Sequence, residues 1–510
     1  MPGELYSVPD LLKRPPRDRL AIVDGTGGGA RRASYGELLE RSRRWAGLLR
    51  ERGLRRGDRV AIFLPRSIEA VVALFAVLFA GGVGVLAYER LRTRQLRYIL
   101  EHSGAAFLLT DGRQLLYVPG LQPVAAEILR VERGAVPSAE PSDERVIGAD
   151  VALLLYTSGS TGQPKGVVLS HENLLSGTRT VAGYLDLGPD DVLVSLLPFS
   201  FDYGLNQLLT ALLVGGTLVL QRSTFPSDVC DTLRRERVTG MAGVPALWTQ
   251  LTQGRSPFLA RSFPHLRYVT NTGGRMPEEV VRAVRRVHPH VQVYLMYGLT
   301  EAFRSTYLAP DQVDRRPSSI GKAIPGVEIL VVGADGHPCA SGQVGELVHR
   351  GANVALGYWR DPEASAEVFR PHPGPLPGGV RETVVYSGDL VRTDEDGYLY
   401  FVGRRDQRIK HRGFRVSPEE VEALLHGSEL VASAVVFGVG GDGAGERIVA
   451  AVTPKDGTPF REDALRDFCK REMPEYLRPE VIWRVDRPPL TASGKPDRPA
   501  LREEYAGNAR

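Results

Sequence analysis

The stretch Tyr156–Gly166, which reads YTSGSTGQPKG, decides the interpretation of this sequence. It follows the apolar run VALLLY, which is typical of a strand buried on both faces of a sheet. Glycines let backbone N–H groups turn toward an anion, hydroxyl side chains add donors, and Lys165 adds a mobile positive charge. The stretch therefore predicts a phosphate-binding loop. It departs from the Walker pattern, because neither Ser nor Thr follows the lysine.

Short apolar runs alternate with helix-length segments around this loop, and such alternation predicts an α/β fold with mainly parallel sheets. The expected strands are Val151–Tyr156, Val192–Leu197, Thr217–Leu220, Arg267–Thr270 and Val291–Met296. The expected helices are Glu172–Tyr184, Asn206–Leu213, Ser227–Arg235 and Glu278–Val287.

A domain boundary is expected where the character of the sequence changes, near Gly403–Arg408. We expect a large N-terminal domain of several subdomains at 1–404 and a small α+β domain at 405–510. In the small domain, Ser417-Pro418-Glu419-Glu420 predicts a helix start, with serine as the cap and proline in the first helical position. The Pro- and Gly-rich segment Pro371–Val380 predicts an exposed loop.

Composition excludes several classes of protein. The 510 residues carry 64 Lys and Arg against 60 Asp and Glu, so charge gives no case for nucleic-acid binding. Cys230, Cys339 and Cys469 lie far apart and predict neither a metal cluster nor a disulfide framework, as expected in the cytoplasm. The uncharged run Ala70–Tyr88 is interrupted by Gly81-Gly82. This favours a buried helix and a strand over a membrane span.

Further motifs follow the loop in a fixed order. They are YGLTE at 297–301, YSGD at 386–389, GRRD at 403–406 with Lys410–Gly413 after it, and PLTASGKPDR at 489–498, preceded by SYGEL at 34–38 and the segment 78–81. Together with the phosphate loop they resemble the adenylate-forming superfamily of acyl-CoA synthetases, adenylation domains of non-ribosomal peptide synthetases, and luciferases. The resemblance covers essentially the whole chain.

The resemblance implies an enzyme that uses ATP and Mg²⁺. A carboxylate would attack the α-phosphate of ATP and release pyrophosphate, and a phosphopantetheine thiol would then displace AMP from the acyl-adenylate. Two anions must meet in the first step, which requires positive charge at the reacting oxygens. Lys495, between Gly494 and Pro496, is the implied catalytic residue. The small domain would be mobile and would carry this lysine.

The same resemblance assigns the nucleotide-binding residues. ATP phosphates would contact Thr157, Ser158, Gly159, Ser160, Thr161, Gly162, Lys165 and Thr300, and adenine would contact Gly273, Gly274, Tyr297 and Gly298. The ribose would be held by Asp389 and Arg404, and the metal by Glu301. Asp406 is the implied hinge, and Gly413 would line the pantetheine tunnel.

The acid substrate is the open question. The implied pocket residues are Asp202, Tyr203, Asn206, Ala242, Thr272, Met296 and Arg304. Asp202 either binds the ammonium group of an amino acid or caps a helix that begins at Tyr203. Arg304 either holds a second carboxylate on the substrate or pairs with a protein acid such as Asp202.

Two activities therefore stay open, besides a degenerate relative that only binds nucleotide. The first is activation of an α- or β-amino acid and its transfer to a separate carrier protein, because no carrier module follows Arg498. The second is an AMP-forming acyl-CoA synthetase that uses a fatty or other organic acid and free CoA. The segment MYGLTEAFRSTYL resembles both free-standing ligases that load β-amino acids and acyl-CoA ligases found with exosortase systems.

Overall fold

The computed structural model of the chain describes most of its residues. These are residues 5–25, 30–157, 164–254, 256–405, 409–411, 414–440, 446–455, 457, 459–473, 477–491 and 494–508.

The larger sheet changes from parallel to antiparallel halfway across. Its order is β16 (Val327–Val332), β17 (Gly345–Gly351), β20 (Thr383–Thr393), β21 (Leu399–Arg404), β15 (Ser319–Ala323), β14 (Ala302–Leu308), β13 (Gln292–Leu299), β12 (Tyr268–Asn271), β11 (Gly240–Gly243), β9 (Val192–Ser195), β10 (Thr217–Leu220), β1 (Leu20–Asp24) and β2 (Arg31–Ser34), with β19 (Phe369–Pro371) beside β20. Neighbours from β1 to β13 pair in parallel. From β13 to β16 they pair antiparallel.

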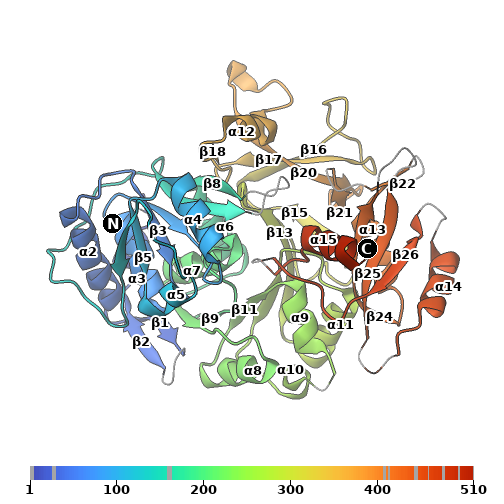
Figure 1. The fold of residues 1–510 in the computed structure, drawn as a ribbon, viewed down its shortest axis with the longest axis horizontal. Helices are drawn as coiled ribbons and strands as arrows, with labels where there is room; N and C mark the ends of the chain where they lie inside the picture. Colours follow the sequence, from blue (N-terminus) through green and yellow to red (C-terminus); the bar gives the residue numbers. More distant parts are fainter. Residues whose placement is uncertain are drawn as a thin grey trace.

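The second sheet contains the predicted phosphate loop. Its order is β18 (Gly357–Tyr358), β8 (Lys165–Ser170), β7 (Val151–Thr157), β4 (Val83–Leu86), β3 (Arg59–Phe63), β5 (Phe107–Thr110) and β6 (Glu127–Arg130). Strands β7 and β8 form an antiparallel hairpin in which Thr157 pairs with Lys165, so both ends of the loop are fixed. The predicted α/β class is confirmed by this arrangement of sheets and helices (Figure 1).

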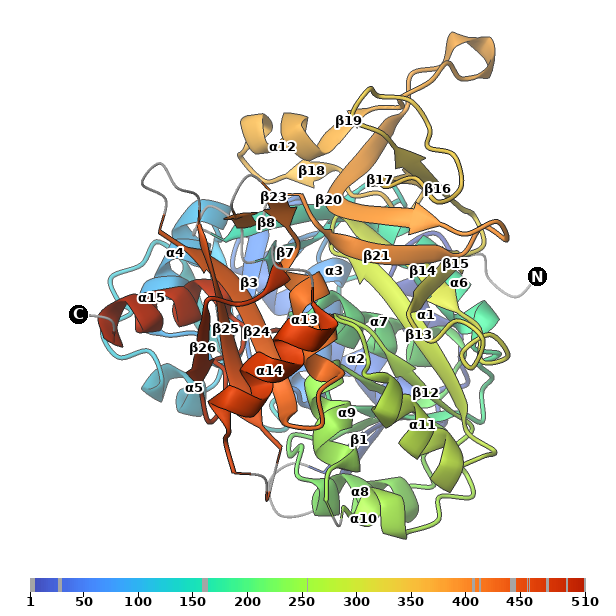
Figure 2. The same cartoon turned by 90° about the vertical axis from the view of Figure 1, so that its right-hand side faces the viewer.

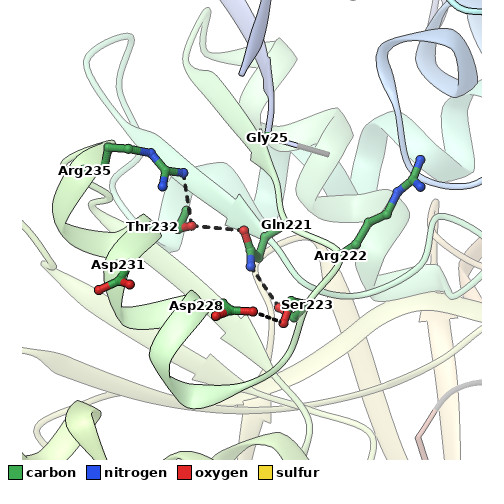
Figure 3. Close-up of a pocket in the computed structure, with 8 residues that line it drawn as sticks. All are labelled: Gly25, Gln221, Arg222, Ser223, Asp228, Asp231, Thr232 and Arg235. Atoms are coloured by element: carbon green, nitrogen blue, oxygen red, sulfur yellow. Dashed lines mark hydrogen bonds between the residues drawn. The ribbon is translucent and has the colours of Figure 1, made fainter. Parts of the chain in front are cut away.

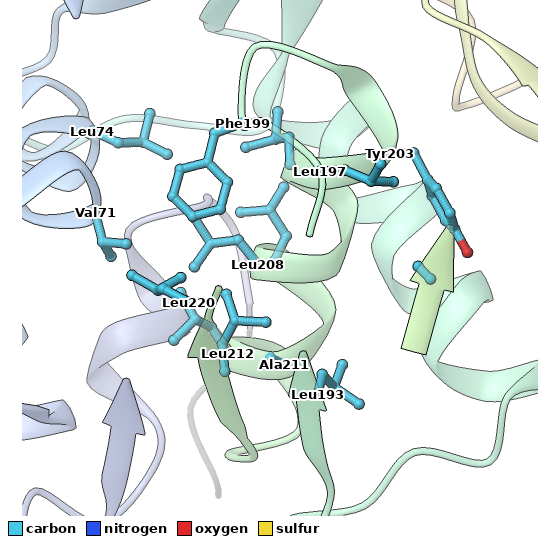
Figure 4. Close-up of a cluster of buried hydrophobic side chains, with 14 of the residues drawn as sticks. Val71, Leu74, Leu193, Leu197, Phe199, Tyr203, Leu208, Ala211, Leu212 and Leu220 are labelled. Carbon is cyan, nitrogen blue, oxygen red and sulfur yellow. The ribbon is translucent and has the colours of Figure 1, made fainter. Parts of the chain in front are cut away.

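Two buried helices join the sheets. Every residue of α3 (Ile68–Phe79) is buried, and so is every residue of α7 (Asp202–Leu213) except its last. Figure 4 shows Val71 and Leu74 of α3 beside Phe199 and Leu208, in the core that supports the start of α7. The helix-then-strand interpretation of the run at 70–88 is confirmed by α3 and β4. No helix in the described ranges has the length and apolar character that crossing a membrane requires.

The large unit contains further helices besides α3 and α7. They are α1 (Asp10–Lys13), α2 (Tyr35–Glu51), α4 (Thr93–Ser103), α5 (Gly112–Leu116), α6 (His171–Tyr184), α8 (Pro226–Arg235), α9 (Pro245–Thr252), α10 (Pro257–Ala260), α11 (Glu278–Val287), α12 (Pro362–Val368) and the 3₁₀ turn η1 (Pro377–Gly379). Helix α6 packs against α7 and against strands of both sheets, among them β8 and β14. The predicted helices agree within a residue, except that α7 begins at Asp202 instead of Asn206.

The C-terminal part of the chain forms a smaller unit beside the large one (Figure 2). It contains β22 (Ile409–His411), β23 (Phe414–Val416), α13 (Pro418–His426), β24 (Val431–Val439), β25 (Arg447–Pro454), α14 (Glu462–Glu472), β26 (Val481–Arg484) and α15 (Arg498–Asn508). It has its own core, which includes Val421, Val436 and Leu465. Helix α13 begins as predicted, with the Ser417 hydroxyl accepting a hydrogen bond from the Glu420 N–H.

A buried carboxylate fastens the first turn of α3. Glu69 accepts hydrogen bonds from Arg31 at 2.8 Å and from Arg41 at 3.1 Å. Burial alone would raise the pKa of Glu69, but the Arg31 hydrogen bonds, with that from the Gly134 N–H, lower it to about 2. Because the pKa of Glu69 is lower in the folded than in the unfolded state, the ionised carboxylate stabilises the fold at pH values above its unfolded-state pKa. This stabilisation is lost as the pH falls through the folded-state pKa.

We expect Glu69→Gln to lower the free energy of unfolding at pH 7 by about 1–3 kcal/mol. The difference from wild type should narrow as the pH falls below about 4.5 toward 2. Urea unfolding followed by fluorescence at several pH values measures this. Glu40→Gln is the control, because the Glu40–Arg44 pair is exposed and such pairs contribute about 0.5 kcal/mol. Equal effects of the two variants at pH 7 would contradict the interpretation.

Candidate active site

The predicted adenine turn and the predicted catalytic lysine lie side by side. Gly273 follows β12 with φ of +79°, a left-handed conformation that favours glycine. A Cβ at Gly273 would lie 3.6 Å from Cε of Lys495 and 3.7 Å from Cζ of Phe201. The Asn271 side chain donates a hydrogen bond of 2.8 Å to the Gly274 carbonyl and fixes the turn. The small unit therefore delivers Lys495 to the carboxyl ends of the parallel strands, where ligands bind in such sheets.

The two predicted ribose-binding residues and Tyr297 come together from three strands. The Tyr297 hydroxyl donates a hydrogen bond to Asp389, and Nε of Arg404 lies 3.3 Å from Oδ1 of Asp389. Burial raises the pKa of Asp389, and the positive charges of Arg404 and Lys495 act against that rise. The His349 ring stacks on Tyr297 with centroids 6.1 Å apart. Burial lowers the pKa of His349 to about 3, so this ring is neutral at physiological pH.

The predicted metal ligand is connected to the phosphate-loop lysine through a tyrosine. The Tyr358 hydroxyl in β18 donates a hydrogen bond of 2.7 Å to Oε1 of Glu301. Nζ of Lys165 lies 5.1 Å from the centre of the Tyr358 ring, within the range of a cation–π contact. Thr300 lies next to Glu301 in the turn between β13 and β14. Glu301 and Lys165 therefore share one neighbourhood, as the predicted roles require.

The predicted acid pocket is built from α7 and four neighbouring strands. Asp202 and Arg304 form a buried ion pair, and each side chain is at most 4% exposed. The Tyr203 hydroxyl contacts the Thr270 hydroxyl and lies 3.4 Å from Sδ of Met296. Ala242 of β11 is buried, and Thr272 is buried after β12 with its N–H donating to the Gly243 carbonyl at 3.2 Å.

The start of α7 and the ion pair bear on the alternatives left open for Asp202 and Arg304. The capping alternative is wrong, because α7 begins at Asp202 itself and Phe201 occupies the cap position without a side-chain hydrogen bond. Of the two alternatives for Arg304, the pair with a protein acid is the one present. Arg304 is also one of the few non-glycine residues with positive φ, +73°, in the described part of the chain.

Seven predicted site residues lie outside the described residues. They are Ser158, Gly159, Ser160, Thr161 and Gly162 of the phosphate loop, Asp406 of the hinge and Gly413 of the tunnel.

A separate surface pocket of about 370 Å³ is lined by Gly25, Gln221, Arg222, Ser223, Asp228, Asp231, Thr232 and Arg235. Figure 3 shows that several of its polar groups bond to one another, for example Thr232 to Gln221 at 3.0 Å. None of the nucleotide-site residues described above lines it.

Family models match this chain over both of its parts. The model described as AMP-binding enzyme matches residues 10–359, and the model described as AMP-binding enzyme C-terminal domain matches residues 420–495. The chain belongs to the AMP-binding enzyme family. The resemblance drawn from the motifs is thereby confirmed, and with it the prediction that the protein is an enzyme.

Curated relatives of this chain include CoA synthases and peptide synthases. Feruloyl-CoA synthase of an Amycolatopsis species is 34% identical over 471 residues, which are 92% of this chain and 93% of that protein. Gramicidin S synthase 2 of Aneurinibacillus migulanus is 31% identical over 474 residues, which are 92% of this chain but 10% of that protein. This chain thus spans about a tenth of the length of gramicidin S synthase 2.

Solved structures of family members have the same fold over the whole chain. ATP-bound MatB from Rhodopseudomonas palustris has a TM-score of 0.87 and 28% identity, and covers 99% of this chain and 100% of that one. O-succinylbenzoate CoA synthetase from Bacillus subtilis, in complex with ATP and a magnesium ion, has a TM-score of 0.84 and 26% identity over 99% of this chain and 100% of that one.

Sequence reasoning missed three supporting residues of the site. Tyr358, His349 and Asn271 each touch a predicted residue but stand outside the quoted motifs. Only Asn271 carried a usable signal, because a polar residue directly before Gly273-Gly274 at the end of a buried strand is well placed to hold the turn.

We expect Asp389→Asn to weaken AMP binding by about tenfold, because an amide accepts fewer hydrogen bonds from ribose hydroxyls than a carboxylate does. The protonated form of Asp389 cannot accept both hydrogen bonds from the ribose, so wild-type affinity for AMP should fall as the pH is lowered. Because the pKa of Asp389 is raised, this fall should begin at a higher pH than it would for a carboxyl group with an ordinary pKa. Titration calorimetry with AMP between pH 5 and 8 measures both effects. Asp396→Asn, at an exposed carboxylate, is the control. An unchanged affinity and pH profile in Asp389→Asn would contradict the assignment.

Proposed function

We propose that this protein activates a carboxylic acid by forming an acyl-adenylate from ATP and then transfers the acyl group to a thiol. The observation that carries the proposal is the position of Lys495 beside the Gly273 turn, close to Tyr297 and Asp389. A lysine that a separate unit places beside the predicted adenine- and ribose-binding residues fits a reaction that needs positive charge at two reacting anions.

In the first step, an oxygen of the substrate carboxylate bonds to the α-phosphorus and the bond to pyrophosphate breaks. Lys495 balances the negative charge on the carboxylate and on the α-phosphate oxygens as they approach. Asp389 and Arg404 hold the ribose, and Tyr297 keeps Asp389 in place through its hydroxyl hydrogen bond. In the second step, the thiol sulfur bonds to the acyl carbon and releases its proton to the solvent. The bond from that carbon to the phosphate oxygen breaks, AMP leaves, and a thioester remains.

The residues present fit a magnesium ion held mostly by phosphates. Within the described residues no group of three or more His, Cys, Asp or Glu forms a metal site, whereas Mg²⁺ on a nucleotide needs only one or two carboxylates besides phosphates and water. Glu301 supplies one carboxylate, and Tyr358 orients it. Bound there, Mg²⁺ would neutralise charge on the phosphate oxygens.

The Asp202–Arg304 pair supports an acid without an ammonium group. The carboxylate that would receive an ammonium already accepts a hydrogen bond from Arg304. An ammonium beside this pair would add a buried positive charge next to a guanidinium, which is costly. We therefore infer an organic acid as substrate, and CoA as the thiol, in line with the feruloyl-CoA synthase relative that this chain covers almost completely.

A second candidate is activation of an amino acid for a separate carrier protein. It is supported by the Phe201-Asp202 sequence at the start of α7 and by the 31% identity to gramicidin S synthase 2. In this case the amino acid would have to displace Arg304 from Asp202.

ATP–pyrophosphate exchange separates the two candidates. We expect organic acids to drive exchange with a kcat/KM at least about tenfold above that of amino acids of equal length, because a buried ammonium would face Arg304. Thioester formation with CoA and with a phosphopantetheinylated carrier protein then identifies the acceptor. Exchange driven only by amino acids would support the second candidate. Nucleotide binding without exchange for any acid would overturn both.

We expect Tyr358→Phe to raise the Mg²⁺ concentration for half-maximal exchange by about tenfold, because groups that orient a metal ligand typically contribute factors of about 10–100. Measuring exchange rates across a magnesium titration tests this. Tyr400→Phe is a matched control, since the Tyr400 hydroxyl donates to Asp394 at 3.0 Å away from the site. The same magnesium dependence in Tyr358→Phe and wild type would remove Tyr358 from the site.

A further inference from the structure

Within the described part of the chain, four of the buried polar atoms without partners belong to Asn206 and Arg304, at the Asp202–Arg304 pair. Both amide atoms of Asn206 and the Nε and Nη1 atoms of Arg304 have no hydrogen-bond partner among the described residues. The two residues are 1% and 2% exposed. Buried polar groups are almost always hydrogen-bonded, so unpaired ones of this kind need an explanation, and a bound ligand is one.

These groups belong to one place in the fold. Asn206 follows Asp202 by one turn of α7, and residues at this spacing share a helix face. The Arg304 guanidinium lies 4.8 Å from the Tyr203 ring, and a Cβ at Gly298 would lie 3.5 Å from its Cζ. Asp202 directly follows Phe201, whose ring reaches the Gly273 turn beside Lys495. The unpaired groups therefore lie close to where Lys495 would meet the reacting carboxylate.

The orientation of Arg304 is imposed by the backbone. Its φ of +73° is unfavourable for a residue with a side chain, and the Asn353 side chain donates a hydrogen bond to the Arg304 carbonyl. Backbone strain of this kind persists where the surroundings enforce it, and it clusters at functional sites. Within the described residues the hydrogen bond to Asp202 comes from Nη2, so the N–H of Nε and the two N–H of Nη1, which lie on different edges of the planar guanidinium, remain as donors.

Charge restricts what these donors can bind. Asp202 and Arg304 neutralise each other, so a second carboxylate or an ammonium on the acyl group would bring an uncompensated charge into a buried region. An uncharged group that accepts a hydrogen bond from Nε or Nη1 of Arg304, donates one to Oδ1 of Asn206 and accepts one from its Nδ2 gives both side chains a partner without adding charge.

We propose that the acid substrate carries an uncharged substituent that both donates and accepts hydrogen bonds, such as a hydroxyl or carboxamide group, and that this substituent is recognised by Asn206 and the unpaired N–H groups of Arg304. This inference rests on the proposed acid-activating function and names the substrate class of the same site.

Matched acids test the inference. Hexanoate is compared with hexanoates that carry a hydroxyl at carbon 2, 3 or 6, with adipate, with its monoamide and with 6-aminohexanoate, by kcat/KM in ATP–pyrophosphate exchange. We expect at least one hydroxyl or amide acid to exceed hexanoate by about tenfold or more, since a site built to hydrogen-bond a substrate group rejects the analogue that lacks it. The charged acids should fall below the preferred neutral one.

Variants assign the preference to the proposed atoms. Asn206→Leu should reduce the ratio of kcat/KM for the preferred acid to kcat/KM for hexanoate to near one. Gln207→Leu is the matched control on the same helix, because the Gln207 amide donates to the Val194 carbonyl at 3.3 Å on another face, and it should keep the ratio. The preference for the polar acid over hexanoate can also be measured as a ratio of dissociation constants of the corresponding acyl-sulfamoyl adenosines. Because this measurement needs no turnover, a loss of activity in a variant does not obscure the preference.

The outcomes separate this inference from the proposed function. Exchange with hexanoate as good as with every polar acid, or a preference that survives Asn206→Leu, would overturn the substrate class and leave the ligase function standing. A preference for adipate or 6-aminohexanoate would show that Arg304 leaves Asp202. This result would also overturn the inferred substrate class. Absence of both exchange and acyl-sulfamoyl adenosine binding would overturn the ligase function itself.

Discussion

The buried ion pair between Asp202 and Arg304 fixes the geometry on which the rest of the site depends. It joins the first residue of α7 to β14, and a carboxylate in the first turn of a helix is additionally favoured by the helix dipole. Phe201, next to the pair, reaches the turn that receives Lys495, and Gly298 packs on the Arg304 guanidinium. Loss of either charged partner would leave the other buried and unpaired, which in proteins typically costs about 3–5 kcal/mol.

In the smaller unit, the turn that carries Lys495 is held by hydrogen bonds to the rest of that unit. The turn before α15 closes through a hydrogen bond of 2.7 Å from the Thr491 N–H to the Lys495 carbonyl. Directly after this turn, Arg498 binds both carboxylate oxygens of Glu422, at 2.7 and 2.9 Å, and so ties α15 to α13. Burial raises the pKa of Glu422 to about 7 against the opposing charge of Arg498. The turn that carries the lysine is therefore fastened to the core of the C-terminal unit.

The sequence predicted the parts of the site that depend on local pattern. Thr157 and Lys165 could be placed at the ends of one loop because buried strands flank it, and they are register partners in the β7–β8 hairpin. The antiparallel strands between Ala302 and Arg404 were not predicted, since half-buried strands such as β20 carry mixed burial and no continuous apolar run. The partner of Asp202 stayed open because 102 residues separate it from Arg304, and sequence spacing does not determine contacts at that range.

The two ends of the proposed site differ in charge: positive side chains lie near the predicted nucleotide-binding residues, whereas the predicted acid pocket contains a neutral ion pair. At the nucleotide end, Lys165, Lys495 and Arg404 lie near Tyr358, the Gly273 turn and Asp389. Such fixed charges act on charge that develops during reaction, which is how electrostatic catalysis operates. At the acyl end, Asp202 and Arg304 cancel each other. A neutral, buried end contributes little to stabilising a charged transition state, but it discriminates strongly between groups that can and cannot satisfy its hydrogen bonds. In the proposed function, rate and specificity would thus arise from different ends of one site, joined at the Phe201-Asp202 peptide.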